Sequence, residues 1–342
     1  MWLVRAALAQ GVDPLVLAGC LWPKWRVWTI DLDREIDDGR LSKLVCQSGI
    51  DESVLRAATL MPIARATGLE DATKIAIWPW VLALGSRNRK RRGGLQYCPL
   101  CLASDAHPYF RIQWRLAWHT GCAVHGKSLF DRCCHCQSPV EPNRLAAGTA
   151  LSTCSTCKGD MRHGTGLPAA TAALAFQQCA DSVALAGAGQ YGRHRLAAKE
   201  WFFLARYFVM LLRYASRYRS SNLARCLNRL DSNVARLQPP VTGLGFEMLP
   251  PAERSQFLAC IVTLIQAGPE LLQEAVMATP LSSASLRQGW RSLPPHINEI
   301  VHRLPHSERS RKAEKKVDRE PVSRKSVVYR WARLLRKIRQ GL

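Results

Sequence analysis

Cysteine and histidine residues are concentrated between residues 98 and 157, at spacings that suit metal binding. Cys98 and Cys101 are separated by two residues, and Cys122 and His125 repeat that spacing after 20 further residues. A turn of this kind brings two ligand atoms to one ion, and a structural zinc site takes four ligands in a tetrahedron, commonly from two such turns. The four residues therefore predict one site of three cysteines and a histidine.

The same pairing recurs directly downstream. Cys133 and Cys136 are followed, after 17 residues, by Cys154 and Cys157, which predicts a second site of four cysteines. An interleaved assignment, in which the two ions exchange pairs of ligands, stays open, and the cysteine and histidine inside the first of these turns could compete as ligands. Because both sets are saturated by protein ligands, no position is left for water or substrate. We expect two Zn²⁺ ions per chain that hold the fold and perform no chemistry.

The segment between the first two turns, "PYFRIQWRLAW" at 108–118, is predicted to be one helix that packs across the metal sites. Arg111 and Arg115 are four residues apart and would share one exposed face. Such a pair suits the carboxylates of a partner protein or a phosphate, and a solvated pair is the alternative. We assign partner binding to these two arginines.

The composition indicates an anionic partner. The 342 residues include 48 Lys and Arg against 26 Asp and Glu, a formal charge of +22, and 47% of the residues are hydrophobic. Nucleic acid is the first candidate for the partner, and a basic soluble surface is the alternative. The first residues lack the features of a signal peptide, and we found no segment suited to span a membrane. We therefore expect a cytoplasmic protein whose paired cysteines bind metal and do not form disulfides.

Two segments carry much of the positive charge. "RNRKRRGG" at 87–94 has five basic residues in its first six, and residues 303–342 contain 14 Lys and Arg and four acidic residues, a net of +10. Within the latter, "SVVYRWARLLRKIRQ" is predicted to form a basic amphipathic helix, with a solvated tail as the alternative. The residues that we assign to nucleic-acid binding are Arg87, Arg89, Lys90, Arg91, Arg92, Arg324, Lys325 and Arg330.

The remaining patterns are helical. Leu41 to Leu60 reads as two short helices around Gly49, which is typical of a helix-turn-helix unit or of a plain helical hairpin. Helical patterns return from about Leu167, and five isolated cysteines are expected in the core. We predict a mostly α protein with four parts: a helical N-terminal domain with the helix-turn-helix-like segment at 1–95, a double zinc-binding domain at 96–162, a C-terminal helical bundle at 163–305 and a basic tail at 306–342.

The Cys/His segment also resembles a known family. "YCPLCLASDAHPYFRIQWRLAWHTGCAVHGKSLFDRCCHC" is similar to the TniQ family, which includes the TnsD-like target selectors of bacterial transposons. The similarity is carried by Tyr97-Cys98-Pro99, Asp105, Pro108 to Arg111, Trp114-Arg115 and the ligand turns. "WLVRAALAQGVDP" and "LWPKWRVWTIDLDR" extend it to roughly residues 1–160. The chain departs from the family in opening directly at Met1-Trp2, without a preceding stretch, and in having Cys134 where proline is more frequent.

The resemblance implies a non-enzymatic accessory protein that selects or marks a transposition target and links it to an AAA+ ATPase, which recruits the transposase. Some members bind DNA directly, and others form a dimer and attach to an RNA-guided CRISPR effector complex. The sequence has neither the paired carboxylates of a transposase nor a G-x-x-x-x-G-K-[ST] phosphate loop. The alternative is a zinc-containing, site-specific DNA-binding regulator that is not tied to a transposase. A zinc hydrolase or nuclease is disfavoured by the saturated ligand sets.

Overall fold

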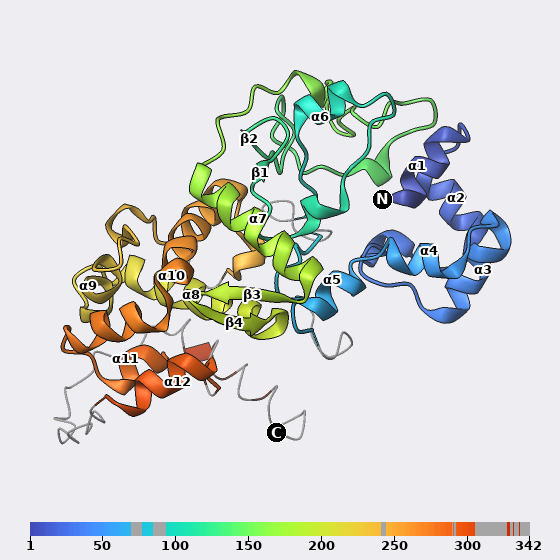
Figure 1. The fold of residues 1–342 in the computed structure, drawn as a ribbon. Coiled ribbons are helices and arrows are strands. Elements are labelled where there is room, and N and C mark those ends of the chain that lie inside the picture. Colours follow the sequence, from blue (N-terminus) through green and yellow to red (C-terminus); the bar gives the residue numbers. More distant parts are fainter. Residues whose placement is uncertain are drawn as a thin grey trace. The chain divides into compact units, whose positions relative to one another are not determined.

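The computed structural model describes residues 1–69, 77–84, 94–240, 244–288, 290 and 292–304, with Val327, Val328, Trp331 and Leu335 from the C-terminal part (Figure 1). The chain forms two compact units, Met1–Leu304 and Pro305–Leu342. In the second unit the four described residues are exposed. All eight residues assigned to nucleic-acid binding lie outside the described residues.

The N-terminal part is a set of short helices: α1 (Trp2–Ala9), α2 (Pro14–Leu21), α3 (Asp38–Ser48), α4 (Glu52–Ala57) and α5 (Met61–Ala66). The Asp37 carboxylate accepts the Arg40 backbone N–H at the start of α3, and Gly49 ends that helix with a φ of 66°. Asp51 accepts the Ser53 N–H in the same way at the start of α4. The two carboxylates satisfy N–H groups that a helix start leaves unpaired, and the glycine lets the chain turn after α3. Two short helices joined by a turn are thus present where the helix-turn-helix-like segment was expected.

The Cys/His region has little regular structure. It contains α6 (Pro99–Ser104), the single-turn 3₁₀ helices η2 (Ile112–Arg115), η3 (Pro142–Arg144) and η4 (Met161–His163), and a two-residue hairpin of β1 (Gly121–Cys122) and β2 (Lys127–Ser128). The predicted helix over 108–118 is wrong, because only η2 is helical. The chain straightens after η2, where the Ala117 N–H donates to Trp80 O at 2.7 Å and the Leu82 N–H donates to Arg115 O at 2.9 Å. Pairing with residues 80–82 thus replaces the helical hydrogen bonds.

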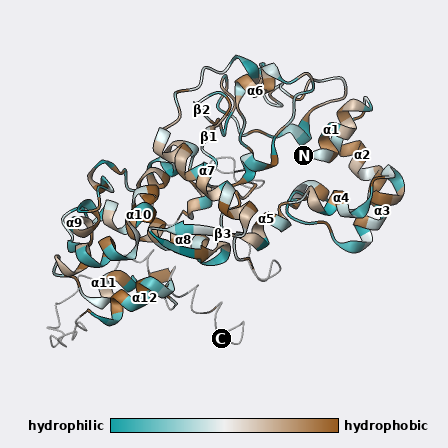
Figure 2. Cartoon of the chain, viewed as in Figure 1, coloured by the Kyte–Doolittle hydropathy of each residue, from teal (hydrophilic) through white to brown (hydrophobic). Residues whose placement is uncertain are grey.

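The C-terminal part is helical, as expected, and hydrophobic residues recur along its helices (Figure 2). Its elements are α7 (Thr171–Ala186), β3 (Ala188–Tyr191), β4 (His194–Ala197), α8 (Ala198–Arg217), α9 (Asn222–Asn228), η5 (Val234–Arg236), η6 (Phe246–Met248), α10 (Pro251–Met277), α11 (Ser283–Arg287) and α12 (Pro295–His302). The sequence did not predict the antiparallel β3–β4 hairpin, whose register pairs Ala188 with Ala197.

The turn of this hairpin fits a break in α10. Gly268, with a φ of 77°, interrupts α10 just before Pro269, and the Gly192 N–H donates to Ile265 O at 2.8 Å. A Cβ on Gly192 would lie 2.7 Å from the Gly268 Cα. Because that approach is closer than van der Waals contact allows, only glycine fits at this crossing.

Buried apolar residues of the described chain form three clusters. One joins α1 to α4, one surrounds the Cys/His ligands, and the largest combines the C-terminal helices with residues 60–69 and 78–82. Trp80 is 1% exposed and packs edge-on against the rings of Trp118, Phe202 and Phe246. Residues 60–69 and 78–82, which the sequence placed with the N-terminal domain, therefore share their core with the C-terminal helices.

Within the part of the chain that the structure describes, one helix is long and apolar enough to cross a membrane by length and composition, and the bent pair α1–α2 passes the same test as a pair. That single helix is α10. Its apolar side chains, such as Phe257, Ile261 and Leu264, are buried against the rest of the core. We interpret α10 as a core helix of this fold.

Candidate metal centres

The first group of ligand atoms has the dimensions of a tetrahedral site. The His125 Nδ1 lies 3.7, 3.3 and 3.5 Å from the sulfurs of Cys98, Cys101 and Cys122, and the last two sulfurs are 3.5 Å apart. Metal–sulfur bonds of about 2.3 Å and metal–nitrogen bonds of about 2.0 Å give tetrahedral S–S edges of about 3.8 Å and S–N edges of about 3.5 Å. The residues thus fit a zinc ion in both chemistry and spacing.

The second group has the same dimensions. Cys133 and Cys157 have sulfurs 3.8 Å apart, and those of Cys136 and Cys154 are 3.7 Å apart. All four ligand atoms lie within 4.8 Å of one another. The first two ligand pairs along the chain thus form one group and the last two form the other. This is the sequential assignment and not the interleaved one.

Two similar turns position the second group. In each turn the N–H two residues after the first cysteine donates to its sulfur at 3.4 Å, from His135 to Cys133 and from Thr156 to Cys154. Each turn then passes through a residue with positive φ, 57° at Gln137 and 62° at Lys158. The repeated geometry holds each sulfur pair on one side of its turn, which is what convergence on one ion requires.

Cys134 and His135, which could compete as ligands inside the Cys133–Cys136 turn, contact other groups. The Cys134 sulfur is 4.0 Å from Met161 O, and the His135 Nε2 lies 2.8 Å from Asp160 O. Among the described residues neither belongs to a ligand group.

The protonation of the thiols supports a cation in both groups. Burial raises the pKa of the Cys101 thiol to about 11 and that of the Cys133 thiol to about 12, whereas a hydrogen bond with Cys98 lowers the pKa of the Cys122 thiol to about 4 and one with Ser138 lowers that of Cys136 to about 6. Metal ligation requires thiolates, and several neighbouring thiolates in a buried place are stable together only beside a cation. The donor sets therefore suit a dication such as Zn²⁺, which neutralises the thiolates and leaves no position open for a reactant.

The two arginines that were assigned to partner binding do not form one exposed face. Arg111 pairs with both Asp105 oxygens, at 2.9 and 3.1 Å, and its guanidinium lies over the rings of Tyr109 and Trp114. Arg115 is only 2% exposed. The expected shared face is thus corrected, because the chain between them is not an α-helix.

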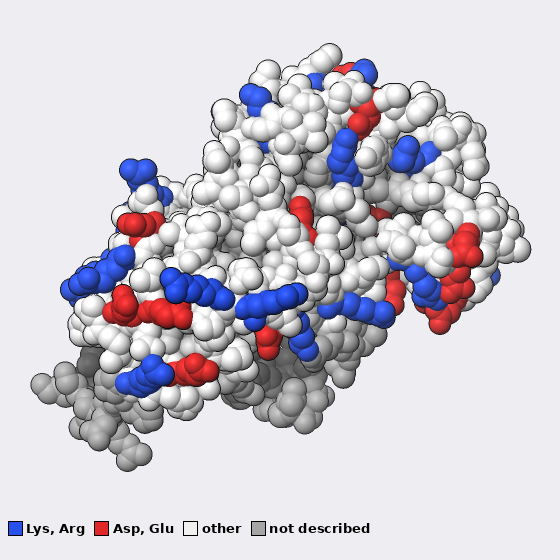
Figure 3. Space-filling model, viewed as in Figure 1, with Lys and Arg blue, Asp and Glu red and all other residues white. Residues whose placement is uncertain are grey.

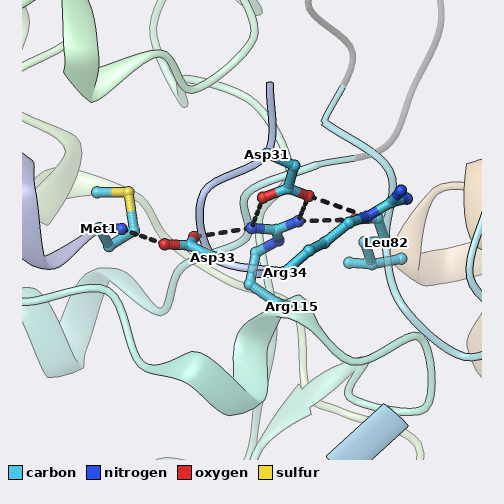
Figure 4. Close-up of polar contacts among 6 residues, drawn as sticks. All are labelled: Met1, Asp31, Asp33, Arg34, Leu82 and Arg115. Atoms are coloured by element: carbon cyan, nitrogen blue, oxygen red, sulfur yellow. Dashed lines mark hydrogen bonds and ion pairs between the residues drawn. The ribbon is translucent and has the colours of Figure 1, made fainter. Parts of the chain in front are cut away.

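Arg115 instead connects the Cys/His region to the N-terminal helices (Figure 4). Its guanidinium donates to Asp31 Oδ1 at 3.1 Å, to Asp33 Oδ2 at 2.8 Å and to Leu82 O at 2.9 Å. Asp33 also pairs with the amino group of Met1. Burial opposes ionisation of Asp33, but the Met1 amino group and Arg115 outweigh it and hold the pKa of this carboxyl below its usual range.

A second buried arginine ties the Cys/His region to the C-terminal helices. Arg254 of α10 is 1% exposed and donates to Gln96 Oε1 at 2.6 Å and to the carbonyls of Leu249 and Ala117. Burial lowers the pKa of Arg254 to about 10, still well above neutrality. No sequence pattern indicates this role, because the acceptors are mostly backbone carbonyls far away along the chain.

Several residues are placed differently from our expectations. His119, which the sequence did not single out as a core residue, is buried and lies 2.8 Å from Asp181 Oδ1, which also accepts the Trp118 indole N–H. Of the five cysteines expected in the core, Cys226 and Cys260 are buried and Cys179 is intermediate. The other two, Cys20 and Cys46, are exposed.

Charged side chains of both signs lie on the face drawn in Figure 3, and basic side chains form a row across the β3–β4 hairpin and α5. The exposed residues of this row are Arg65, Arg193, Arg195 and Lys199. Over α3, α4 and their caps, the acidic residues Asp37, Asp38, Asp51 and Glu52 lie among Arg40, Lys43 and Arg56, and ion pairs join Asp37 to Arg40 and both Asp38 and Glu52 to Arg56. These charges nearly balance, so α3 and α4 present no strongly basic surface to phosphates.

Comparison with known proteins gives one match. Residues 2–129 match the TniQ family, which confirms the resemblance seen in the sequence. No curated protein and no solved structure matches the chain. The matched segment includes the first ligand group, and the second ligand group lies beyond its end.

Proposed function

From the match of residues 2–129 to the TniQ family, we propose that the chain is a non-enzymatic transposition accessory protein of this family, which selects or marks a target site and links it to an AAA+ ATPase and its transposase. The observation that carries the proposal is the TniQ match itself. It covers the N-terminal helices, the Arg115 network and the first metal centre, which are joined through buried contacts.

The metal centres would hold the scaffold of this adaptor. Cys98, Cys101, Cys122 and His125 would bind one Zn²⁺, and the four cysteines between 133 and 157 a second. Because neither set leaves an open coordination position, the ions would supply no hydrolytic chemistry. This supports the assignment as a non-enzyme.

DNA contact is the second part of the proposal. The chain carries a net charge of +22, and the exposed row of Arg65, Arg193, Arg195 and Lys199 offers phosphate contacts. Binding through phosphates should weaken steeply as salt concentration rises, because counterions are released on association. Because its proposed partners are DNA and an ATPase, and because α10 is buried as a core helix, we place the protein in the cytoplasm and not in a membrane.

A reconstituted transposition assay tests the proposal. Transposase, the AAA+ ATPase encoded beside this chain and a donor element are combined with and without the full-length protein, and insertion sites are sequenced. We expect insertion at a defined target only when the protein is present. Insertion that is unchanged without it would contradict the proposal.

Capture of the ATPase separates this function from the alternative. If full-length protein binds target DNA but captures no ATPase, with or without DNA, the regulator that is not tied to a transposase is the better account. The insertion assay run with and without an RNA-guided CRISPR effector complex, which some family members use, shows whether the protein needs that complex, and light scattering of the purified protein shows whether it dimerises.

A further inference from the structure

A cleft of about 760 Å³ lies between the N-terminal helices and the Cys/His region. Trp22, Trp28 and Leu55 line it from the first side, and Phe110 and Val140 from the second. Its volume is within the range of about 300–1,000 Å³ that is common for binding pockets. Aromatic walls of this kind bury large apolar groups at little entropic cost.

Among the described residues, the base of the cleft presents no cation that lacks a carboxylate partner. Arg115 lines it, but its guanidinium is already paired with Asp31 and Asp33 and with a backbone carbonyl (Figure 4). A phosphate placed here would lose its hydration without gaining an unpaired cation, which is costly. The interior therefore suits aliphatic or aromatic groups and not the backbone of a nucleic acid.

The edge of the cleft is different, because it carries exposed cations and exposed rings. Arg5 is exposed, lies over the Tyr109 ring at 5.4 Å and has no carboxylate partner among the described residues. The Arg144 side chain is 55% exposed and forms an ion pair with Glu141, Nε to Oε2 at 3.5 Å. Trp2 and Tyr109 are 40% and 38% exposed. An occupant would thus meet apolar walls inside and arginines outside.

We propose that this cleft binds a short segment of a partner protein, in which an aromatic or branched aliphatic side chain enters between Trp28 and Phe110 and flanking carboxylates pair with Arg5 and Arg144. Guanidinium groups form strong, bidentate hydrogen bonds with carboxylates, and buried aromatic contacts commonly dominate binding energy. This inference rests on the proposed function and deepens it, since it names where the protein partner of the adaptor docks.

Two pairs of variants test the inference with little risk to the fold. Ala58→Trp places a large ring in the cleft from an exposed position, and Ala172→Trp adds the same ring at an exposed position of α7 outside the cleft. Arg5→Glu reverses the charge at the edge, and Arg225→Glu makes the same change on α9. Metal content and circular dichroism are measured first, to show that each variant is folded.

The probe is a random dodecapeptide display library selected on the full-length protein, with Ala58→Trp as the counter-selection target. We expect enrichment of peptides that combine acidic residues with an aromatic or branched aliphatic residue. The best peptide should bind wild type, Ala172→Trp and Arg225→Glu equally, and Ala58→Trp and Arg5→Glu at least about tenfold more weakly, a difference of about 1.4 kcal/mol. A single-stranded dT12 oligonucleotide should not displace it.

Three results would overturn the inference: no enriched peptide, equal binding to Ala58→Trp and Ala172→Trp, or displacement by the oligonucleotide. The outcome is separable from that of the proposed function. If wild type and Ala58→Trp capture the ATPase equally, the cleft is not the docking site, but the adaptor function stands. If the protein binds the peptide through the cleft but captures no ATPase, the cleft is a binding site, but the adaptor function is contradicted.

Discussion

The two metal centres share their chemistry but differ in their surroundings. In the first, Cys98, Cys101 and Cys122 are 0%, 1% and 4% exposed, whereas in the second Cys136 and Cys157 are exposed. The first centre also lies within the TniQ match, and the second lies beyond it. The same two-residue spacing within each ligand pair therefore occurs in two different environments. The first centre is part of a hydrophobic core, and the second joins two turns at the periphery of that core.

The difference in burial has an energetic meaning. Around the first centre, Tyr97, Leu102 and Trp114 are buried with the ligands in one apolar cluster, and Arg115 links this cluster to the N-terminal helices. Cys133 and Cys154 of the second centre face the same cluster, while its other two ligands face solvent. Loss of the first ion should thus spread through the molecule, and loss of the second should stay local.

Ligand replacement should have the largest effect. We expect Cys101→Ser to lose one metal equivalent and to unfold the Cys/His region, because apparent zinc-binding energies in small structural sites are about 10–16 kcal/mol and are coupled to folding. Cys157→Ser should lose one equivalent while amides near Trp114 stay protected. Elemental analysis and hydrogen exchange measure both. Equal loss of protection in the two variants would contradict the comparison.

Breaking the ion pairs beside each centre should come next. Arg115→Met removes the buried cation that Asp31 and Asp33 share, while Arg34 stays beside Asp31 and the Met1 amino group beside Asp33. The free energy of unfolding should therefore fall by about 3 kcal/mol, the low end for a broken buried pair. Arg162, which pairs with Asp160 beside the second centre and is 44% exposed, is the matched control. Arg162→Met should leave the free energy of unfolding nearly unchanged, since solvent screens exposed pairs. Urea titrations give both values, and similar costs would show that the first centre has no special link to the N-terminal helices.

Removal of metal by a chelator should proceed in two steps. The exposed sulfurs of Cys136 and Cys157 are accessible to a chelator, so the first equivalent released should come from the second centre, at least about tenfold faster, a barrier difference of about 1.4 kcal/mol. Metal release is followed with a chromogenic chelator in wild type and in Cys157→Ser. The fast step should be absent in the variant. A fast step that persists there would assign rapid release to the buried centre.

The dependence of stability on pH should be the smallest effect. The pKa of Asp33 is lowered in the folded state, so its contribution to stability is complete above its unfolded pKa of about 3.9 and is lost as pH falls through the folded value. The pKa of Glu247, buried beside Arg206, is lowered too, with the same sign. Urea midpoints should thus be flat from pH 7 to 5 and fall below about pH 4. The urea midpoint of Arg115→Met should fall less steeply with pH, because the substitution removes one cause of the lowered pKa of Asp33. An equal slope for wild type and Arg115→Met would contradict this account.

The sequence by itself determined the ligands and the class of the fold. Cysteine turns act locally, because two residues between ligands bring both sulfurs to one side whatever the rest of the chain does, and helix caps such as Asp37 and Gly49 act within one turn. The family resemblance rested on the same local residues. These features could be inferred without knowing which segments meet in space.

Only the tertiary structure decided what the arginines do and where the cores divide. The local sequence predicts that Arg115 is exposed on a helix. Its carboxylate partners, Asp31 and Asp33, are 84 and 82 residues away in the sequence. Arg254 bonds to carbonyls, which every residue has, so no side-chain pattern could mark it. The β3–β4 hairpin depends on a turn that fits the break at Gly268. Each of these contacts joins distant segments, and local spacing carries no information about such pairs.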